Sequence, residues 1–361
     1  MINNDDIIIL TQLIGVGLKL RDNAPACTNV TIPKTKWQRV YDLAQKQGVL
    51  AIVFDAISAL SIVSQLPNEL KYRWIAAVSM RESNYLKQYV CATELSDIFK
   101  SQGITTTALK GLSIATYYPV SSHREFGDFD CFLGNDYERG NIIMEKYGAK
   151  VERDYYRHSH IYYKGVMIEN HQFCVGVRGS NKMKDFERYL RSVIHNGCDE
   201  LIEKTSLTKP SSDFNALFLI SHAMTHFLVE GIKLRHVCDW ALLLHNEQDK
   251  INWKEFYKWT DELHYTKFAN ALTAISMQYF GLKLYNDDVG SEAVHCDSIM
   301  DDMFYEESIF NKGYGVWKSR IISITNRLKS LWKFKRIYQR SAVVVIFEQV
   351  IGFLFDRKPS I

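Results

Sequence analysis

The sequence contains few prolines, no paired cysteines and no excess of charge of one sign. Its 361 residues include only six prolines, and none lies between Pro210 and Pro359. Because proline breaks helices, this gap predicts a largely helical C-terminal region. The seven cysteines are scattered and form no C-x-x-C pair. This spacing excludes a disulfide framework and a four-cysteine zinc site, and it favours reduced thiols in a cytoplasmic protein.

The charge balance excludes some classes of protein. The formal net charge of +3 is too small for a protein that coats nucleic acid, although it leaves room for a local basic patch. Hydrophobic residues make up 47% and charged residues 24%, so neither a disordered chain nor a coiled coil is indicated. The length suits two domains, or one domain with a large helical extension.

A membrane-spanning segment and a signal peptide are also missing from the pattern. The start, MINNDDIIILTQLIG, has acidic residues before its apolar run and lacks a basic n-region, so export is not expected. The segment 341–355 is shorter than the roughly 20 apolar residues of a span. We interpret it as a core or docking helix. The preceding run RLKSLWKFKRIYQR predicts an amphipathic helix with Leu331 and Phe334 toward the core. Peripheral membrane contact through 327–355 is the alternative.

The remaining pattern predicts an α+β fold with a small mixed sheet flanked by helical regions. Helical apolar spacing covers 37–60 with a break near Gly48, and Pro67 opens a long helix that stops before Gly103. The centre alternates between strand-like and helical segments, and the helical period returns from Phe214 onward. We therefore predict an N-terminal helical region (1–97), a catalytic core (98–178) and a C-terminal helical region (179–361).

One strand of the predicted core, GDFDCFLG, carries two aspartates on the same side. Asp128 and Asp130 are two residues apart, and side chains alternate across a strand. Such a pair repels itself unless a divalent cation lies between the carboxylates. Downstream, HIYYKGVMIENHQF predicts a hairpin with its turn at Lys164-Gly165. Its second strand presents Glu169 on one side, which makes this residue the candidate third ligand.

A further feature precedes the aspartate strand. The segment ITTTALKG predicts a strand that feeds a turn at Lys110-Gly111, followed by Ser113. Backbone N–H groups, a hydroxyl and an ammonium at such a turn suit the phosphates of a nucleotide. The sequence therefore places phosphate-binding groups and metal-binding carboxylates in one small core.

These residues carry a resemblance to a known family. The segment ALKGLSIATYYPVSSHREFGDFDCFL, followed by VMIENH, resembles the DNA polymerase beta type nucleotidyltransferase superfamily. It is most similar to a bacterial family of uncharacterised nucleotidyltransferases, with a Leu-Lys-Gly turn, Gly-Asp-x-Asp and an acidic-x-His strand. The flanks are similar too, with W-x-x-V-x-x-L-A upstream and H-x-x-x-H leading to R-x-V-x-D-W downstream. The superfamily's Gly-Ser pair is here Gly-Leu-Ser.

The resemblance implies roles for individual residues. Asp128, Asp130 and Glu169 would be the catalytic residues and would bind Mg²⁺ or Mn²⁺. The residues implied to contact the nucleoside triphosphate, ATP or another NTP, are Lys110, Gly111, Ser113, Arg124, Gly127 and His171. In such enzymes a nucleoside monophosphate is transferred in line to an acceptor and pyrophosphate leaves. The acceptor, whether a protein, a small molecule or an RNA end, is not given by the motif.

Several polar residues admit more than one interpretation. Arg124 suits a phosphate but can equally pair with Glu125 or Asp128. His158 and His160 share one face of a strand. Exposure of this face to solvent is a simpler explanation for the pattern than a metal site. Four polar residues downstream are expected at the interface of the helical and catalytic regions or on the nucleotide: His222, His226, Arg235 and Asp239. A buried pair of Arg235 with Asp239 is one option. The spacing of the first two histidines, with His236 and Asp239 following on the next helix, also suits zinc or iron, as in helical metal-dependent phosphohydrolases.

The sequence thus predicts a cytoplasmic, metal-dependent nucleotidyltransferase. Two alternatives stay open. One is a catalytically silent module with the same fold, such as an antitoxin-like binding partner, and the other is a kinase-like transfer of the terminal phosphate.

Overall fold

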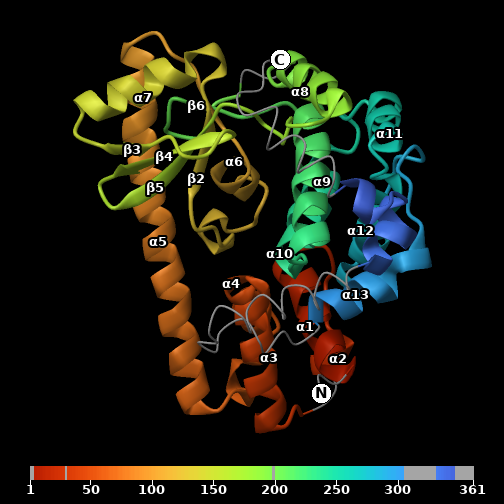
Figure 1. Cartoon of the computed structure of the whole chain (residues 1–361). Coiled ribbons are helices and arrows are strands. Elements are labelled where there is room, and N and C mark those ends of the chain that lie inside the picture. The colour runs from red at the N-terminus through yellow and green to blue at the C-terminus, as the bar shows by residue number, and fades with distance from the viewer. Residues whose placement is uncertain (1–3, 29–30, 197–199, 305–330, 346–361) are drawn as a thin grey trace, which may run out of the picture.

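The computed structural model describes residues 4–28, 31–196, 200–304 and 331–345. A single mixed sheet lies at one end of a long helix (Figure 1). The other helices form an N-terminal and a C-terminal group. This long helix, α5 (Asn68–Ser101), spans roughly 50 Å at 1.5 Å per residue. It connects the N-terminal helices to the sheet, as the proline at position 67 and the apolar spacing predict.

The N-terminal helices pack against one another beside the first half of α5, and α4 contacts it (Figure 1). They are α1 (Asn4–Gly17), α2 (Pro25–Thr28), α3 (Lys34–Gln47) and α4 (Leu50–Ala59). Gly48 separates α3 from α4 with a φ of 69°, a left-handed conformation that glycine adopts without strain. The predicted break near Gly48 is confirmed. Trp74 of α5 is fully buried and donates a hydrogen bond from its indole nitrogen to the carbonyl of Leu50 at 3.0 Å.

The sheet has six strands in the order β3-β4-β5-β2-β1-β6. Their bounds are β1 (Thr106–Ala108), β2 (Phe129–Phe132), β3 (Lys150–Glu152), β4 (His158–Tyr163), β5 (Val166–His171) and β6 (Leu207–Thr208). The hairpin of β4 and β5 turns at Lys164 and Gly165, whose φ angles are both positive at 49° and 72°. The predicted hairpin is confirmed. Strand β5 also pairs in parallel with β2, which brings the two polar strands side by side.

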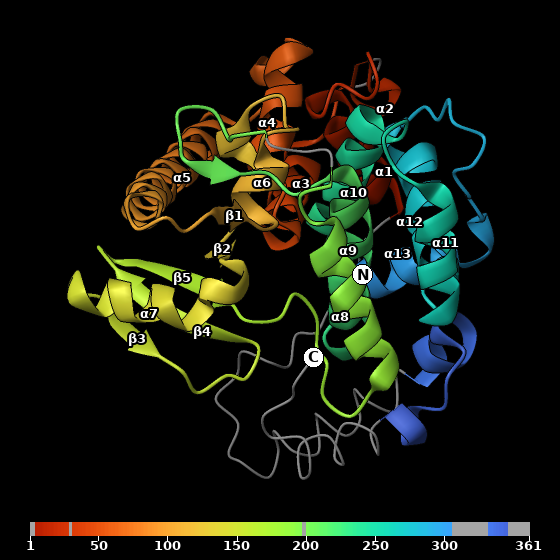
Figure 2. The same ribbon diagram turned by 90° about the horizontal axis from the view of Figure 1, so that it is seen from above.

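The two faces of this sheet differ in chemistry. On one face, Phe129, Cys131, Ile161 and Ile168 are fully buried in an apolar cluster with α5 and α7 (Tyr137–Lys146). Burying such side chains contributes about 1.5–3 kcal/mol each. Figure 2 shows α7 lying along the strands. Because side chains alternate, the residues between these apolar ones point the opposite way, and they are polar in β2, β4 and β5. The sheet therefore presents a polar face away from α7.

The C-terminal helices form the other wall of the molecule. Their bounds are α8 (Asn181–Val193), α9 (Ser212–Val229), α10 (Leu234–Glu247), α11 (Trp253–Glu262), α12 (Thr266–Ile275) and α13 (Cys296–Phe304). The helices α9 and α10 pack against each other and carry large buried aromatic side chains such as Phe218 and Trp240. The indole of Trp240 donates to the Thr273 hydroxyl of α12 at 2.9 Å. The helical character expected after Pro210 is confirmed.

The fold class is α+β, as predicted. The predicted boundaries fall within continuous structure, since α5 runs through Asp97 and β6 joins the sheet from beyond residue 178. The division into three regions stays a prediction. Two short elements complete the central segment, α6 (Gly111–Ala115) and a 3₁₀ turn, η2 (Ser121–His123).

The basic aromatic run is only partly within the described residues. Its described part contains a short π-helical segment, η6 (Lys333–Tyr338), in which Ile337 is fully buried. Leu331 is 45% exposed, so its predicted position in the core is wrong. Residues 327–330 and 346–355 lie outside the described part, and the predictions for them are not addressed by the structure. Among the described helices, none has both the length and the apolarity needed to cross a membrane.

Candidate active site

Three carboxylates meet on the polar face of the sheet. Asp128 immediately precedes β2, Asp130 lies within β2, and Glu169 lies opposite Asp130 in the parallel register of β2 with β5. One oxygen from each of the three carboxylates lies within 4.8 Å of the others. We call these three residues the carboxylate site. The structure therefore brings together the three residues that the sequence nominates as metal ligands.

Neighbouring residues shift the pKa values of the two aspartates in opposite directions. Burial and the neighbouring Asp130 raise the pKa of Asp128. Burial also opposes ionisation of Asp130, but Lys110 and His171 outweigh it and hold the pKa of Asp130 below its usual range. Clustered carboxylate oxygens are the ligands that Mg²⁺ and Mn²⁺ prefer. The donor set and the mutual repulsion that raises the Asp128 pKa both fit a divalent cation.

Lys110 supplies the nearest positive charge. Its ammonium nitrogen lies 2.7 Å from Oδ1 of Asp130. Its backbone has a φ of 38° and a ψ of −119°, a conformation that costs a non-glycine residue about 1–3 kcal/mol. Such strain persists where the surrounding structure fixes the residue. It turns the chain sharply between β1 and α6 and brings the Lys110 side chain to the carboxylates.

The glycines and the serine near this turn occupy different environments. Gly111 and Gly127 both line the cavity beside the carboxylates, and a Cβ at Gly127 would meet no atom within 4 Å. Ser113 is fully buried, is absent from the cavity lining, and its hydroxyl has no hydrogen-bond partner within the described residues. The structure thus places the two glycines, but not Ser113, where a nucleotide could contact them.

Three histidines surround Glu169. Nε2 of His171 lies 3.0 Å from Asp130 Oδ1 and 3.3 Å from Glu169 Oε2. His171 is fully buried, which alone would lower its pKa, but hydrogen bonds to these two carboxylates raise the pKa instead. His158 and His160, from the partner strand β4, approach Glu169 Oε1 with Nε2 at 3.6 and 3.7 Å.

The expectation that His158 and His160 form a solvated face is wrong. Their side chains are only 16% and 12% exposed. A signal for this was present in the sequence. A two-residue turn at Lys164-Gly165 fixes the register, so that His160 must pair with Glu169 and His158 with His171. The polar face of the hairpin is therefore continuous across both strands.

Arg124 has a partner that the sequence did not suggest. Its Nε and Nη2 donate to the two carboxylate oxygens of Asp239 at 2.8 and 2.7 Å, and Tyr118 donates to the same carboxylate at 2.7 Å. The pair is buried, and it joins the central segment to α10. Burial opposes ionisation of Asp239, yet Arg124 lowers the pKa of this carboxyl. The expected partners, Glu125 and Asp128, are not used.

Arg235 also differs from its predicted role. It donates from Nη1 to the carbonyl of Glu125 at 2.8 Å rather than pairing with Asp239. The Glu125 carboxylate is held by Arg81 of α5 at 2.6 Å. Two cationic side chains thus fix the loop that leads into Gly127 and Asp128. Arg235 and Asp239 of α10 thus contact the central segment through the Glu125 carbonyl and Arg124.

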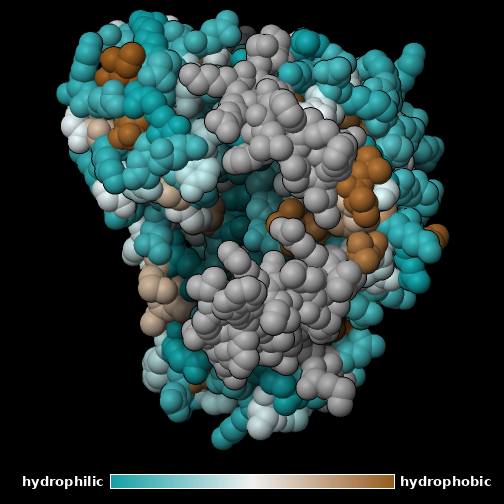
Figure 3. Space-filling model, viewed as in Figure 1, coloured by the Kyte–Doolittle hydropathy of each residue, from teal (hydrophilic) through white to brown (hydrophobic). Residues whose placement is uncertain are grey.

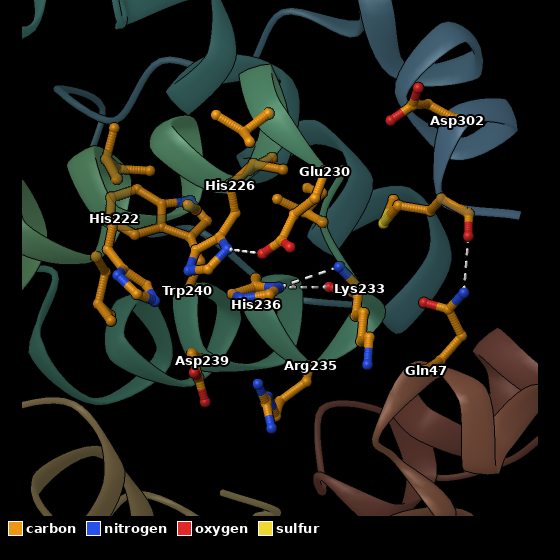
Figure 4. Close-up of a pocket in the computed structure, with 18 of the residues that line it drawn as sticks. Gln47, His222, His226, Glu230, Lys233, Arg235, His236, Asp239, Trp240 and Asp302 are labelled. Atoms are coloured by element: carbon orange, nitrogen blue, oxygen red, sulfur yellow. Dashed lines mark hydrogen bonds and ion pairs between the residues drawn. The ribbon is translucent and has the colours of Figure 1, made fainter. Parts of the chain in front are cut away.

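A cavity of about 1270 Å³ connects the sheet to the helices. Figure 3 shows the hollow in this face of the molecule, with hydrophilic residues in its depth. At the sheet end it is lined by Lys110, Asp128 and Asp130. The opposite wall comes from α9 and α10 and includes His222, His226 and His236 (Figure 4). Burial and nearby positive charge lower the pKa of His222, and burial lowers that of His236 to about 3.

The family comparison agrees with this geometry. A family model described as an uncharacterised nucleotidyltransferase matches residues 33–281. The chain belongs to this nucleotidyltransferase family. The matched range contains both ends of the cavity, from the carboxylates to the helices α9 and α10. No curated protein and no solved structure matches the chain. Nucleotidyltransferases move nucleotidyl groups from a triphosphate, so membership of the family supports transferase chemistry in general.

Proposed function

We propose that this protein is a metal-dependent nucleotidyltransferase that moves a nucleoside monophosphate from an NTP to an acceptor. The observation that carries the proposal is the meeting of Asp128, Asp130 and Glu169 within 4.8 Å beside Lys110, in a chain of the nucleotidyltransferase family. Activity at the carboxylate site and the polymerase beta type relationship are part of this proposal. So is a cytoplasmic location, expected from the scattered cysteines.

In the proposed reaction, a hydroxyl oxygen of the acceptor attacks the α-phosphorus of the NTP. A new phosphorus–oxygen bond forms, the bond to the oxygen bridging the α- and β-phosphates breaks, and pyrophosphate leaves with the electron pair. The hydroxyl proton passes to solvent or to a nearby base. The three carboxylates would hold Mg²⁺ or Mn²⁺, which would neutralise phosphate charge and lower the pKa of the attacking hydroxyl.

The side chains around the carboxylate site support this chemistry. Lys110 sits at Asp130 and can turn its ammonium to a phosphate oxygen once a cation satisfies the carboxylate. Arg124 keeps one guanidinium nitrogen, Nη1, without a partner among the described residues while Asp239 holds the other two in place. Arg124 lines the cavity, so this arrangement offers a fixed donor to a phosphate.

The size of the cavity supports a second substrate. Small-molecule pockets typically measure about 300–1000 Å³, and this cavity reaches about 1270 Å³. The space toward α9 and α10 lies beyond the carboxylates and suits the base of the nucleotide or the acceptor. Gly127 leaves room for phosphates near the metal ligands, because a Cβ there would meet no atom within 4 Å. We assign no phosphate contact to Ser113, because its buried hydroxyl does not line the cavity.

The test is product analysis with purified protein, Mg²⁺ or Mn²⁺, and each NTP labelled in turn at the α- and γ-phosphates. Candidate acceptors are the protein itself, small hydroxyl compounds and RNA ends. The proposal predicts transfer of the α-label and release of pyrophosphate. Transfer of the γ-label with release of a nucleoside diphosphate would instead establish a kinase. Absence of NTP binding in the presence of either metal would favour a silent binding module.

A further inference from the structure

A second group of converging side chains lies in the wall of the cavity opposite the sheet. His222 and His226 are one helical turn apart on α9, and His236 lies in the first turn of α10. One ring nitrogen from each of the three lies within 4.8 Å of the others. The ring centroids of His222 and His226 are 4.4 Å apart. The His236 centroid lies 6.1 Å from that of His222 and 5.5 Å from that of His226. We call these three residues the histidine site.

The outer nitrogens of two of these rings are already held in place. Nδ1 of His226 donates to the Glu230 carboxylate, and Nδ1 of His236 lies 3.0 Å from the backbone nitrogen and 3.3 Å from the carbonyl oxygen of Lys233. The Lys233 backbone N–H donates to His236 Nδ1, which leaves the imidazole proton on Nε2. Metal binding through Nε2 requires His236 to change to the other tautomer, in which Nδ1–H donates to the Lys233 carbonyl. Figure 4 shows both interactions directed away from the space between the three rings. A carboxylate or carbonyl behind the ring is the usual partner of a metal-binding histidine.

The inner nitrogens have no such partners. Among the described residues no hydrogen bond joins the three rings, and His222 makes no hydrogen bond at all in that part of the chain. The rings are half-buried and line the cavity rather than the apolar core. Packing of the core therefore does not account for their convergence, whereas a shared cation does.

We propose that His222, His226 and His236 bind a zinc ion whose remaining coordination position faces the cavity. Zinc holds imidazole nitrogens at about 2.0–2.1 Å, which sets them roughly 3.3 Å apart in a tetrahedral site. The rings need to approach one another by at most about 1.5 Å, which rotation of half-buried side chains can supply. Three protein ligands with a fourth position open are typical of zinc sites that bind water or an anionic substrate oxygen.

The histidine site is distinct from the carboxylate site in ligand chemistry. Imidazole nitrogens favour zinc and similar transition metals, whereas carboxylate oxygens favour Mg²⁺ and Mn²⁺. Both sites line the same cavity, so that a group bound at the open zinc position faces the space above Asp128 and Asp130. The inference does not depend on nucleotidyl transfer, since it rests only on the three imidazoles and their partners.

The experiment is a titration of metal-free full-length protein with Zn²⁺, and separately with Co²⁺ followed by visible absorption. The wild type should bind one Zn²⁺ per chain, and Co²⁺ should give the intense bands of four-coordinate nitrogen ligation. His222→Ala should weaken binding by more than about 100-fold, and Glu230→Gln by about 10- to 100-fold. His245→Ala, an exposed histidine on the same α10, and the Asp128→Asn/Asp130→Asn variant should bind as the wild type does.

Three results would overturn the proposal. One is the absence of zinc binding by the wild type, or weak six-coordinate cobalt bands that indicate oxygen ligands. A second is unchanged affinity in a folded His222→Ala protein. The third is loss of zinc binding in the aspartate variant, which would place the ion at the carboxylates. If His222→Ala does not fold, the wild-type cobalt spectrum and the aspartate variant still decide between the two sites.

Discussion

At the sheet end of the cavity neighbouring cations favour the charged form of a buried carboxyl group, whereas at the helix end burial disfavours the charged form of two histidines. Asp130 is buried, yet Lys110 and His171 lower its pKa and keep it charged. His222 and His236 are not matched by a carboxylate strongly enough to offset burial, so their pKa values are lowered. The difference shows how one cavity can offer hard anionic oxygens at one end and neutral nitrogens at the other.

The two ends also differ in what positions their side chains. The carboxylate site depends on strand register, since the parallel pairing of β2 with β5 places Asp130 opposite Glu169. The histidine site depends on helical spacing and on the approach of α10 to α9. Substitutions at the two ends should therefore separate nucleotide chemistry from zinc binding. The predictions below begin with the largest expected effect.

Replacing Glu169 with glutamine should abolish most of the transferase activity. The change keeps the shape of the side chain but removes one anionic ligand, which we expect to cost on the order of 1000-fold in rate, or about 4 kcal/mol. The measurement is the rate of pyrophosphate release with saturating NTP and Mg²⁺. Glu152→Gln changes a carboxylate on β3, which is separated from β5 by β4, and this matched control should retain activity. A Glu169→Gln rate within tenfold of the wild type would exclude Glu169 as a ligand.

Replacing Arg124 with alanine should destabilise the fold where α10 meets the central segment. Among the described residues, this change leaves the buried Asp239 carboxylate with only the Tyr118 hydroxyl as a hydrogen-bond partner. Breaking such a buried pair costs about 3–5 kcal/mol. Urea unfolding measures the loss. Arg139→Ala removes an exposed pair with Asp136 and should change stability by less than about 1 kcal/mol. Equal effects of the two variants would refute the assigned role of the buried pair.

Replacing Lys110 with methionine should weaken nucleotide binding more than it changes stability. A hydrogen bond from a charged donor contributes about 1.5–3 kcal/mol, which corresponds to an increase in Kd of about 10- to 100-fold. Calorimetric titration with an NTP and Mg²⁺ gives the Kd. Lys46, on α3, lines a different part of the cavity, so Lys46→Met is the control. Similar Kd values for the two variants would argue against a phosphate contact by Lys110.

A smaller effect concerns the pH dependence of stability. His123 is contacted by Asp55 at 2.7 Å and Glu82 at 3.1 Å, and these carboxylates outweigh burial and raise its pKa above 6.5. The stability that His123 contributes is therefore complete below pH 6.5 and is lost as the pH rises through its folded-state pKa. His236 has the opposite sign, since its folded pKa is lowered, and the stability it allows is lost as the pH falls below 6.5.

The measurement is the free energy of unfolding from pH 5 to pH 9 in metal-free buffer. His123→Gln should reduce the decrease expected of the wild type above pH 6.5, the remainder coming from His171, whose pKa is also raised. His245→Gln, at an exposed position, should keep the full decrease. An unchanged pH profile in His123→Gln would contradict the charged state assigned to His123. The comparison sharpens the contrast between histidines beside carboxylates and histidines in the cavity wall.

The aspartate pair of the carboxylate site was predictable because its spacing is local, whereas Glu169 reaches Asp130 through the pairing of β2 with β5. Two aspartates at alternate positions share a strand face, and the Lys164-Gly165 turn fixes where Glu169 falls in its hairpin. The α+β fold was predictable from the same alternation. The pairing of Arg124 with Asp239 was not, because the two residues lie 115 positions apart and nothing in either local pattern encodes their meeting. The same reason explains why Arg235 was assigned the wrong partner.

The burial of individual polar side chains was also not predictable from the sequence. Ser113 follows a glycine turn in the pattern of a phosphate-binding hydroxyl, yet α6 turns it into the interior. His236 joins His222 and His226 only because α10 packs back against α9. The spacing of the first two histidines predicted a shared helix face, and the third ligand required the tertiary structure.

The central claim is that Asp128 and Asp130 bind a nucleotide together with a divalent cation. The most direct measurement is a thermal-shift titration of the wild type and Asp128→Asn/Asp130→Asn with Mg²⁺ or Mn²⁺ and each of the four NTPs. A ligand at 100 times its Kd stabilises the folded state by about 2.7 kcal/mol. We expect metal and nucleotide together to raise the melting temperature of the wild type but not that of the double variant. Equal shifts in both proteins, or no shift in either with any pair, would contradict it.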